Sequence, residues 1–333
     1  GGIPRMLHQS WKTVKIPEKM RKYVASWHKY HSDWEYRFWT DHDCRELFRL
    51  LMSDFLPIYD SYKLPVQRAD ASRYLIIQTY GGVYVDLDFE ALREIDEGLL
   101  GNYTLVIGQE PKAHTHVLFS LERLICNAWL ASVQGHPLWD IVFQELRQRS
   151  NITTISATGP RALDAAFGMY QRSSATAANA STSKMIGESN SFPVKIVDSE
   201  VLYPFFDEAN RDIRRTCAQR EKSKPNPTIH SNNTTNMSTS TTAVLSSSLQ
   251  DNTRLTTREE RLNETCRRLE QLNFKNPPLT NKSYAVHHWV HTWFPGRYSF
   301  SYSSRFSAPS FNAYEAMTQI REQVRKGDKV SQS

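Results

Sequence analysis

The chain has 333 residues, with 39% hydrophobic and 11% aromatic side chains, enough to build one large domain or two ordinary ones. A net charge of +6 is mild over this length and no long basic run occurs, so nucleic acid is not indicated as a partner. No run of roughly 18 or more apolar residues occurs, so no transmembrane helix is expected within the sequence.

The first part of the chain predicts alternating strands and helices, an order typical of α/β nucleotide-binding architecture. The predicted elements are a strand over 3–11, a helix over 17–30, a strand over 34–39, and helices over 41–52 and 66–80. The helix over 66–80 carries Asp70 and Arg73, which share one face because they are three residues apart. A surface ion pair is the alternative interpretation of these two residues.

The stretch from Tyr80 to Asp88, with the sequence YGGVYVDLD, predicts a glycine turn followed by a short buried strand. On an extended backbone Asp86 and Asp88 point to the same side, whereas Leu87 points back into the core. Ligands of open α/β sheets bind at the edge where such strands end, and paired carboxylates suit a hard divalent cation there. A polar strand end in a loop is the alternative.

The later chain predicts strands over 104–107, 126–131 and 194–197, helices over 138–148, 160–169 and 312–325, and a strand that enters the segment 284–293. That last segment holds His287, His288 and His291 among aromatic residues, and is either a metal-binding cluster or a partly buried aromatic edge. Glu110 follows a predicted strand and is either a loop carboxylate or a group on the acceptor side.

Two segments, 171–190 and 219–257, are rich in Ser, Thr, Asn and Ala, and we expect them to be mobile, glycosylated insertions within a single domain over 1–333. Cys217 and Cys266 bracket the second segment, so a disulfide that closes this loop is a hypothesis. A secretory route is favoured by Asn-x-Ser/Thr sequons at Asn102, Asn151, Asn179, Asn232, Asn233, Asn236, Asn263 and Asn281.

One ligand class accounts for these residues together, a nucleotide-sugar with a divalent metal. Asp86, Asp88 and one histidine would hold the ion, and the imidazole favours Mn²⁺ over Mg²⁺. Asp70 and Arg73 would hydrogen-bond sugar hydroxyls. Trp11, which is otherwise a core residue, would offer a flat face to the base. The sequence lacks a nucleophile elbow, a P-loop and a dinucleotide-binding glycine motif, which argues against those enzyme classes.

Three stretches carry a resemblance to a known family: IPRMLHQSWK from Ile3, QRADASRY from Gln67, and GGVYVDLD from Gly81. They resemble the DXD sugar transferases of glycosyltransferase family 32, which include fungal Golgi α-1,6-mannosyltransferases and inositol-phosphorylceramide mannosyltransferases. The resemblance implies a GT-A-type, Rossmann-like nucleotide-sugar-binding domain with a mixed central sheet. It also implies a retaining mechanism.

The resemblance assigns roles by position. It implies that Asp86, Asp88, Asp70 and Arg73 are catalytic, and that the metal ligands are Asp86, Asp88 and His287. His288 and His291 leave the choice of the liganding histidine open. The donor-binding residues implied are Trp11, Asp70, Arg73, Asp86, Thr292 and Trp293.

The expected function is a metal-dependent retaining transferase that moves mannose from GDP-mannose to a glycan. A UDP-hexose donor or a glycolipid acceptor is the alternative. We expect the Golgi lumen, with an N-terminal membrane anchor upstream of the sequence. A catalytically inactive binding protein on the same fold, or a structural glycoprotein, are interpretations of another class.

Overall fold

The computed structural model describes residues 2–152, 155–181, 192–222, 257–290 and 310–312. Among these residues, the central sheet has six strands in the order β3-β1-β4-β7-β6-β8. The strands are β1 (Met6–Ser10), β3 (Glu35–Trp39), β4 (Gly82–Val85), β6 (Leu105–Gln109), β7 (Ile125–Ser132) and β8 (Val194–Val197).

The sheet is mixed because β7 runs against both of its neighbours. Strand β1 is parallel to β3 and β4, β7 is antiparallel to β4 and β6, and β6 is parallel to β8. Strands β3, β1, β4, β6 and β8 therefore end at the same edge of the sheet, which we call the carboxyl edge. The strand order confirms the predicted α/β class with a mixed central sheet.

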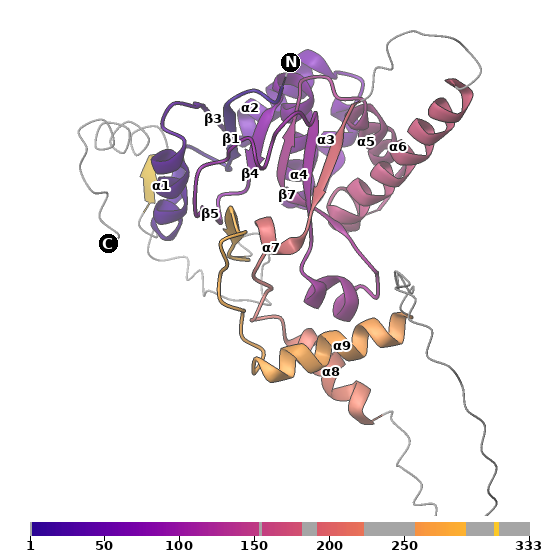
Figure 1. The fold of residues 1–333 in the computed structure, drawn as a ribbon. Coiled ribbons are helices and arrows are strands. Elements are labelled where there is room, and N and C mark those ends of the chain that lie inside the picture. The colour runs from indigo at the N-terminus through magenta and orange to yellow at the C-terminus, as the bar shows by residue number, and fades with distance from the viewer. Residues whose placement is uncertain (1, 153–154, 182–191, 223–256, 291–309, 313–333) are drawn as a thin grey trace, which may run out of the picture.

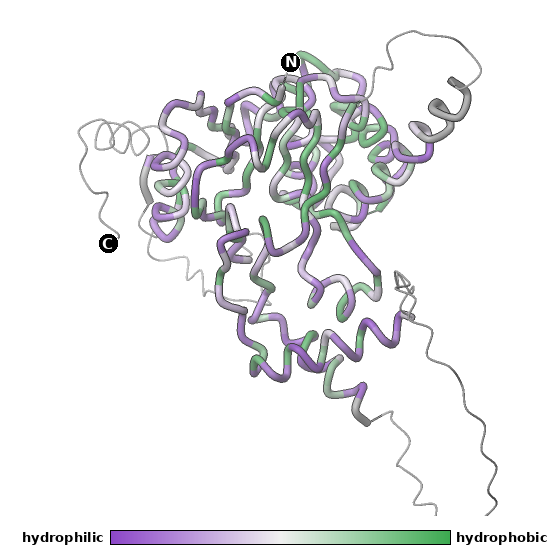
Figure 2. Tube along the Cα trace, viewed as in Figure 1, coloured by the Kyte–Doolittle hydropathy of each residue, from purple (hydrophilic) through white to green (hydrophobic). Residues whose placement is uncertain are grey.

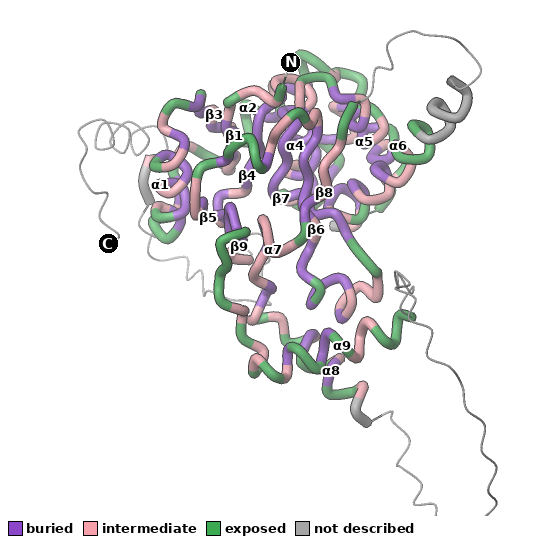
Figure 3. Tube along the Cα trace, viewed as in Figure 1, coloured by how far each residue is buried: buried purple, intermediate pink, exposed green. Residues whose placement is uncertain are grey.

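Helices cover both faces of the sheet (Figure 1). One face packs against α1 (Arg21–Tyr30), α7 (Ser199–Leu202) and a small sheet of β5 (Phe89–Ala91) and β9 (Ala285–His287). The other face packs against α2 (Asp41–Leu51), α3 (Leu56–Ser61), α4 (Pro65–Tyr80), α5 (Leu138–Gln148) and α6 (Pro160–Ser181). The inner strands β4, β6 and β7 are hydrophobic and buried in Figures 2 and 3, as expected for a sheet covered on both faces, whereas the edge strands β3 and β8 are partly exposed.

The turn between α4 and β4 needs two glycines. Gly81 and Gly82 have φ of +65° and +90°, in the region that favours glycine. A Cβ at Gly82 would lie 2.5 Å from the carbonyl oxygen of Met6, and one at Gly81 would lie 2.7 Å from the amide nitrogen of Gln134. The start of β4 can therefore lie close to β1 and to Gln134 only because both positions are glycine. This close approach positions the strand that leads to Asp86.

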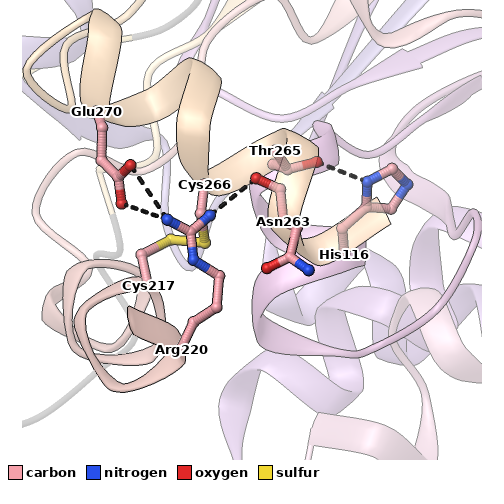
Figure 4. Close-up of a disulfide and its surroundings, with 7 residues drawn as sticks. All are labelled: His116, Cys217, Arg220, Asn263, Thr265, Cys266 and Glu270. Carbon is pink, nitrogen blue, oxygen red and sulfur yellow. Dashed lines mark hydrogen bonds and ion pairs between the residues drawn. A yellow bond between two sulfur atoms is a disulfide. The ribbon is translucent and has the colours of Figure 1, made fainter. Parts of the chain in front are cut away.

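A separate group of helices lies below the carboxyl edge in Figure 1. It consists of the π-helix η2 (Ala113–Leu118), α8 (Arg211–Lys222) and α9 (Arg258–Gln271), which share a small core, and we call it the disulfide lobe. A disulfide joins Cys217 to Cys266, confirming the hypothesis made from the sequence (Figure 4). Arg220 adds an ion pair to Glu270 at 3.1 Å beside it.

The remaining elements refine the predicted boundaries. Residues Lys15–Pro17 form strand β2, paired with β10 (Ser310–Asn312), and a 3₁₀ turn, η1 (Glu18–Met20), precedes α1, so the predicted helix over 17–30 starts later than expected. Another 3₁₀ turn, η3 (Ile155–Ala157), precedes α6.

Helix α6 continues to Ser181, into the segment 171–190 that we expected to be mobile. The rest of that segment, most of 219–257, and the predicted helix beyond Asn312 lie outside the described residues. Within the described ranges, no helix has both the length and the apolar character needed to cross a membrane.

Replacing both lobe cysteines, with Cys217→Ser and Cys266→Ser, is expected to lower the free energy of unfolding by about 2–4 kcal/mol, because the unfolded chain loses a cross-link that closes a long loop. The two residues are 49 positions apart. Denaturant unfolding followed by circular dichroism measures the change. Reductant should reproduce it in the wild type, whose other cysteines, Cys44 and Cys126, are buried and unpaired. Equal unfolding of oxidised and reduced wild type would contradict the expectation.

Candidate functional site

Asp86 and Asp88 lie just past the end of β4, at the carboxyl edge. The Asp86 amide donates to the carbonyl of Ala128 at 2.9 Å, which extends the β4–β7 pairing by one residue. Leu87 between them is buried in the core with 4% of its surface exposed, as the alternation of an extended chain predicts. The two carboxylates keep partial exposure, with 26% and 15% of their side-chain surface accessible.

The pairing of β5 with β9 brings a histidine from the far end of the sequence to these carboxylates. His287 lies opposite Phe89 in the register. One ligand atom from each of Asp86, Asp88 and His287 lies within 4.8 Å of the others, so the structure brings the three predicted metal ligands together.

Asp88 is held by the segment that follows β9. His287 Nε2 lies 3.0 Å from Asp88 Oδ1, and the Val290 amide donates to Asp88 Oδ2 at 2.9 Å. Burial raises the pKa of Asp88, but the charge and hydrogen bond of His287 and the Val290 amide outweigh it and lower the pKa to about 2. Burial lowers the pKa of His287, yet the Asp88 carboxylate raises it above the ordinary value.

Arg73 lies behind Asp86 and bridges it to Asp70. Its guanidinium is 3.2 Å from Asp70 Oδ1 and 3.3 Å from Asp86 Oδ1, and it donates to the carbonyl of Asn127 at 2.8 Å. Burial raises the pKa of Asp86; the Arg73 charge opposes this rise and the neighbouring Asp88 adds to it. The predicted common face of Asp70 and Arg73 is therefore turned inward, toward Asp86, rather than to solvent as a surface pair would be.

Asp70 is fixed by residues that the sequence analysis did not select. Asn127 Nδ2 donates to Asp70 Oδ1 at 2.9 Å, and Thr158 Oγ1 donates to Asp70 Oδ2 at 3.0 Å. Burial raises the pKa of Asp70 to about 6, against the Arg73 charge and these two hydrogen bonds. Tyr84 was also missed: its hydroxyl donates to Asp86 Oδ1 at 3.1 Å. Its place in β4, two residues before Asp86, is the one signal that could have singled it out.

The structure separates the neighbouring histidines. His288 Nε2 bonds to Glu90 Oε2 at 2.8 Å and its ring stacks on Tyr23, so it belongs to a different pair. His291, Thr292 and Trp293 lie outside the described residues.

Trp11 and Glu110 lie at the ends of β1 and β6. Trp11 is partly buried against the core on the α1 face, and its Nε1 has no hydrogen-bond partner in the part of the chain that the structure describes. Its backbone amide donates to the carbonyl of Trp39. Glu110 is buried and bonds to His114 at 2.8 Å, so its carboxylate already has a protein partner.

The donor set fits a divalent metal ion. Two carboxylates and one imidazole are ligands for Mn²⁺ and related cations, and ligand atoms of one ion lie about 3 Å apart. His287 Nε2 and Asp88 Oδ1 lie 3.0 Å apart, a hydrogen-bond distance that already holds these two groups side by side. His287 Nδ1 is buried and has no partner among the described residues, which leaves the imidazole without the second hydrogen bond that a purely structural histidine would make.

Comparisons with known proteins match this chain to glycosyltransferases. Residues 17–106 match the family described as a glycosyltransferase sugar-binding region containing a DXD motif. Inositol phosphoceramide mannosyltransferase 3 of Schizosaccharomyces pombe is 45% identical over 51% of this chain and 46% of its own length. The initiation-specific alpha-1,6-mannosyltransferase of Candida albicans is 27% identical over 41% of this chain and 40% of its own.

The matched region thus spans less than half the length of these curated relatives. Among solved structures, PaToxG Glycosyltransferase aligns with 55% of this chain and 75% of its own, with a TM-score of 0.40 and 16% identity. A likeness at that level adds nothing to the fold class that the strand order gives.

Arg73→Met is expected to lower the free energy of unfolding by about 3–5 kcal/mol at pH 7, because it leaves the buried Asp70 and the partly buried Asp86 without their shared cation. The deficit should shrink as the pH falls toward 5, since Asp70, whose pKa is already raised to about 6, then takes up a proton. Urea unfolding at several pH values measures this. Arg5→Met is the matched control, because Arg5 pairs with Asp33 at the surface and should change stability by at most about 1 kcal/mol. Equal losses in the two variants would refute the bridge.

Metal affinity is expected to fall as the pH is lowered, because His287 must lose a proton to bind an ion. Because the pKa of His287 is raised, the loss of affinity should already begin above pH 6.5, the ordinary pKa of a histidine. Mn²⁺ affinity, measured by calorimetry, should drop about tenfold per pH unit below that pKa, the slope of one displaced proton. His287→Gln should bind more weakly and with a flat profile. A slope that persists in this variant would assign the displaced proton to another group.

Proposed function

Because residues 17–106 belong to the family of glycosyltransferase sugar-binding regions containing a DXD motif, we propose that this chain is a metal-dependent retaining hexosyltransferase. The observation that carries the proposal is the convergence of Asp86, Asp88 and His287 at the carboxyl edge, with Arg73 directly behind them. A structural glycoprotein has no need of such a donor set, and its buried charges would be costly without a function.

The proposed donor is a nucleotide-sugar, with GDP-mannose favoured and a UDP-hexose as the alternative. The relatives named above are mannosyltransferases, which supports mannose. The base rests on family analogy alone. Trp11 is proposed to bind the base through the face of its indole, which lies at the end of β1. Thr292 and Trp293 are proposed to reach the diphosphate.

Each residue of the site then has a task. Asp86, Asp88 and His287 would hold Mn²⁺ or Mg²⁺, which would supply positive charge opposite the leaving diphosphate. Arg73 keeps Asp86 ionised and ready to bind the cation. Asp70 is proposed to accept a hydrogen bond from a sugar hydroxyl through Oδ2, which accepts from Thr158, because Oδ1 already accepts from Asn127 and pairs with Arg73.

Retention is proposed to proceed by front-face displacement. The bond from the anomeric carbon to the phosphate oxygen breaks while the acceptor oxygen bonds to the same face, and the acceptor proton passes to the released phosphate oxygen. The motivation is that Glu110, a carboxylate at the same edge, is engaged by His114 and is not poised as a nucleophile. A covalent glycosyl-enzyme, or an inverted product, would overturn this.

The acceptor is proposed to be a glycan or a glycolipid, since the two groups of relatives carry both kinds of name. The disulfide of the lobe supports an oxidising compartment, and we propose the Golgi lumen with an upstream membrane anchor.

A thermal-shift panel of GDP- and UDP-sugars, with and without Mn²⁺, tests the function. The true donor at about 100 times its dissociation constant should stabilise the protein by roughly 2.7 kcal/mol, and only with the metal present. Asp88→Ala should abolish both this stabilisation and donor hydrolysis. Asp33→Asn is the control, since Asp33 is an exposed carboxylate paired with Arg5 outside the site. Metal-dependent binding without turnover on any acceptor would favour the inactive binding protein, and no binding at all would refute the proposal.

A further inference from the structure

The segment His287–Val290 determines how Asp88 is held. His287 contacts one carboxylate oxygen of Asp88 and the Val290 amide donates to the other. The His288 amide donates to the backbone carbonyl of Asp88 at 3.0 Å. The placement of Asp88 and His287 relative to each other therefore depends on the conformation of this short segment.

Trp289, in the middle of the segment, has an unfavourable backbone conformation. Its φ is +52°, in the left-handed region that residues other than glycine rarely adopt. Such a conformation persists only where the surroundings enforce it. Here the indole Nε1 donates to the carbonyl of Phe205 at 2.8 Å, and the ring packs edge-on between His287, at 4.1 Å, and His114, at 4.4 Å between centroids.

His114 is fixed on both ring nitrogens. Its Nε2 accepts from the Asp207 amide at 3.0 Å, so the ring proton is on Nδ1, which donates to Glu110 Oε2 at 2.8 Å. His114 and Glu110 are buried, with 4% and 7% of their surface exposed. A buried carboxylate and imidazole joined in this way hold one ring orientation, and that ring supports one side of Trp289.

We propose that Glu110 and His114 are positioning residues for the metal site, acting through Trp289. This role rests on the proposed function. A chain of contacts leads from Glu110 at the end of β6, through His114 and Trp289, to the segment that holds Asp88 and His287. Neither residue belongs to the three-residue donor set. Loss of a group that contacts a metal ligand directly commonly changes metal affinity by about 10–100-fold. Trp289 makes such a contact with His287, and His114 and Glu110 act on the site by holding Trp289.

The test is His114→Ala in the full chain, with Mn²⁺ binding measured by calorimetry and by metal-induced thermal stabilisation. We expect His114→Ala to bind Mn²⁺ about tenfold or more weakly than the wild type. In donor turnover, the Mn²⁺ concentration for half activation should rise, while kcat at saturating metal should stay close to the wild-type value. His114→Gln keeps an amide acceptor and donor and should recover part of the affinity.

Two further variants separate positioning from simple destabilisation. His116→Ala is the matched control, because His116 lies on the same turn but bonds to Thr265 and to the carbonyl of Glu122, away from Trp289 (Figure 4 shows the Thr265 contact). It should leave Mn²⁺ affinity unchanged. Glu110→Ala should weaken Mn²⁺ binding, and combining it with His114→Ala should add little, since both act through one ring.

The outcomes distinguish this inference from the function beneath it. If the wild type binds Mn²⁺ but His114→Ala binds it equally well, or His116→Ala weakens it equally, positioning through Trp289 is wrong and the metal site stands. If the wild type itself shows no Mn²⁺ binding and no metal-dependent turnover, the proposed function and this inference both fail.

Discussion

The Arg73 guanidinium between Asp70 and Asp86 is the interaction on which the rest of the site depends. Burial raises the pKa of Asp70 and of Asp86, and the Arg73 charge between them opposes both rises. Arg73 also bonds to the backbone of β7 through the Asn127 carbonyl. Helix α4 and strands β4 and β7 are thus fixed to one charge, and Asp86 is presented to the carboxyl edge as an anion.

The second half of the site is built by a long-range pairing. Strand β9 lies against β5, and this register alone places His287 beside Asp88, 199 residues away in sequence. Because the anchoring contacts of Asp88 come from this segment, the proposed metal site exists only when the two ends of the domain are assembled. A partly folded chain would have the carboxylates but not the imidazole.

The disulfide lobe shows how a chain with a long low-complexity segment keeps its site intact. Cys217 and Cys266 join α8 to α9 covalently at the base of this segment, where both helices pack on η2. The start of η2 carries His114, which contacts Trp289 beside the proposed metal site. The lobe is therefore tied to the site by packing as well as by the covalent chain.

The sequence by itself determined the local geometry, since residue spacing fixes which side chains share a face. The period of apolar residues predicted the six strands of the central sheet and helices α1, α2, α4 and α5 to within a few positions, but it missed α3, α7, α8 and α9. Spacing alone also put Asp86 and Asp88 on one side and Asp70 with Arg73 on one helix face. Only the tertiary structure decided which distant groups meet them. It selected His287 and gave His288 to Glu90, brought Asn127 and Thr158 to Asp70, and bound Glu110 to His114. These choices depend on strand register and helix packing between segments far apart in the chain, and no local spacing contains that information.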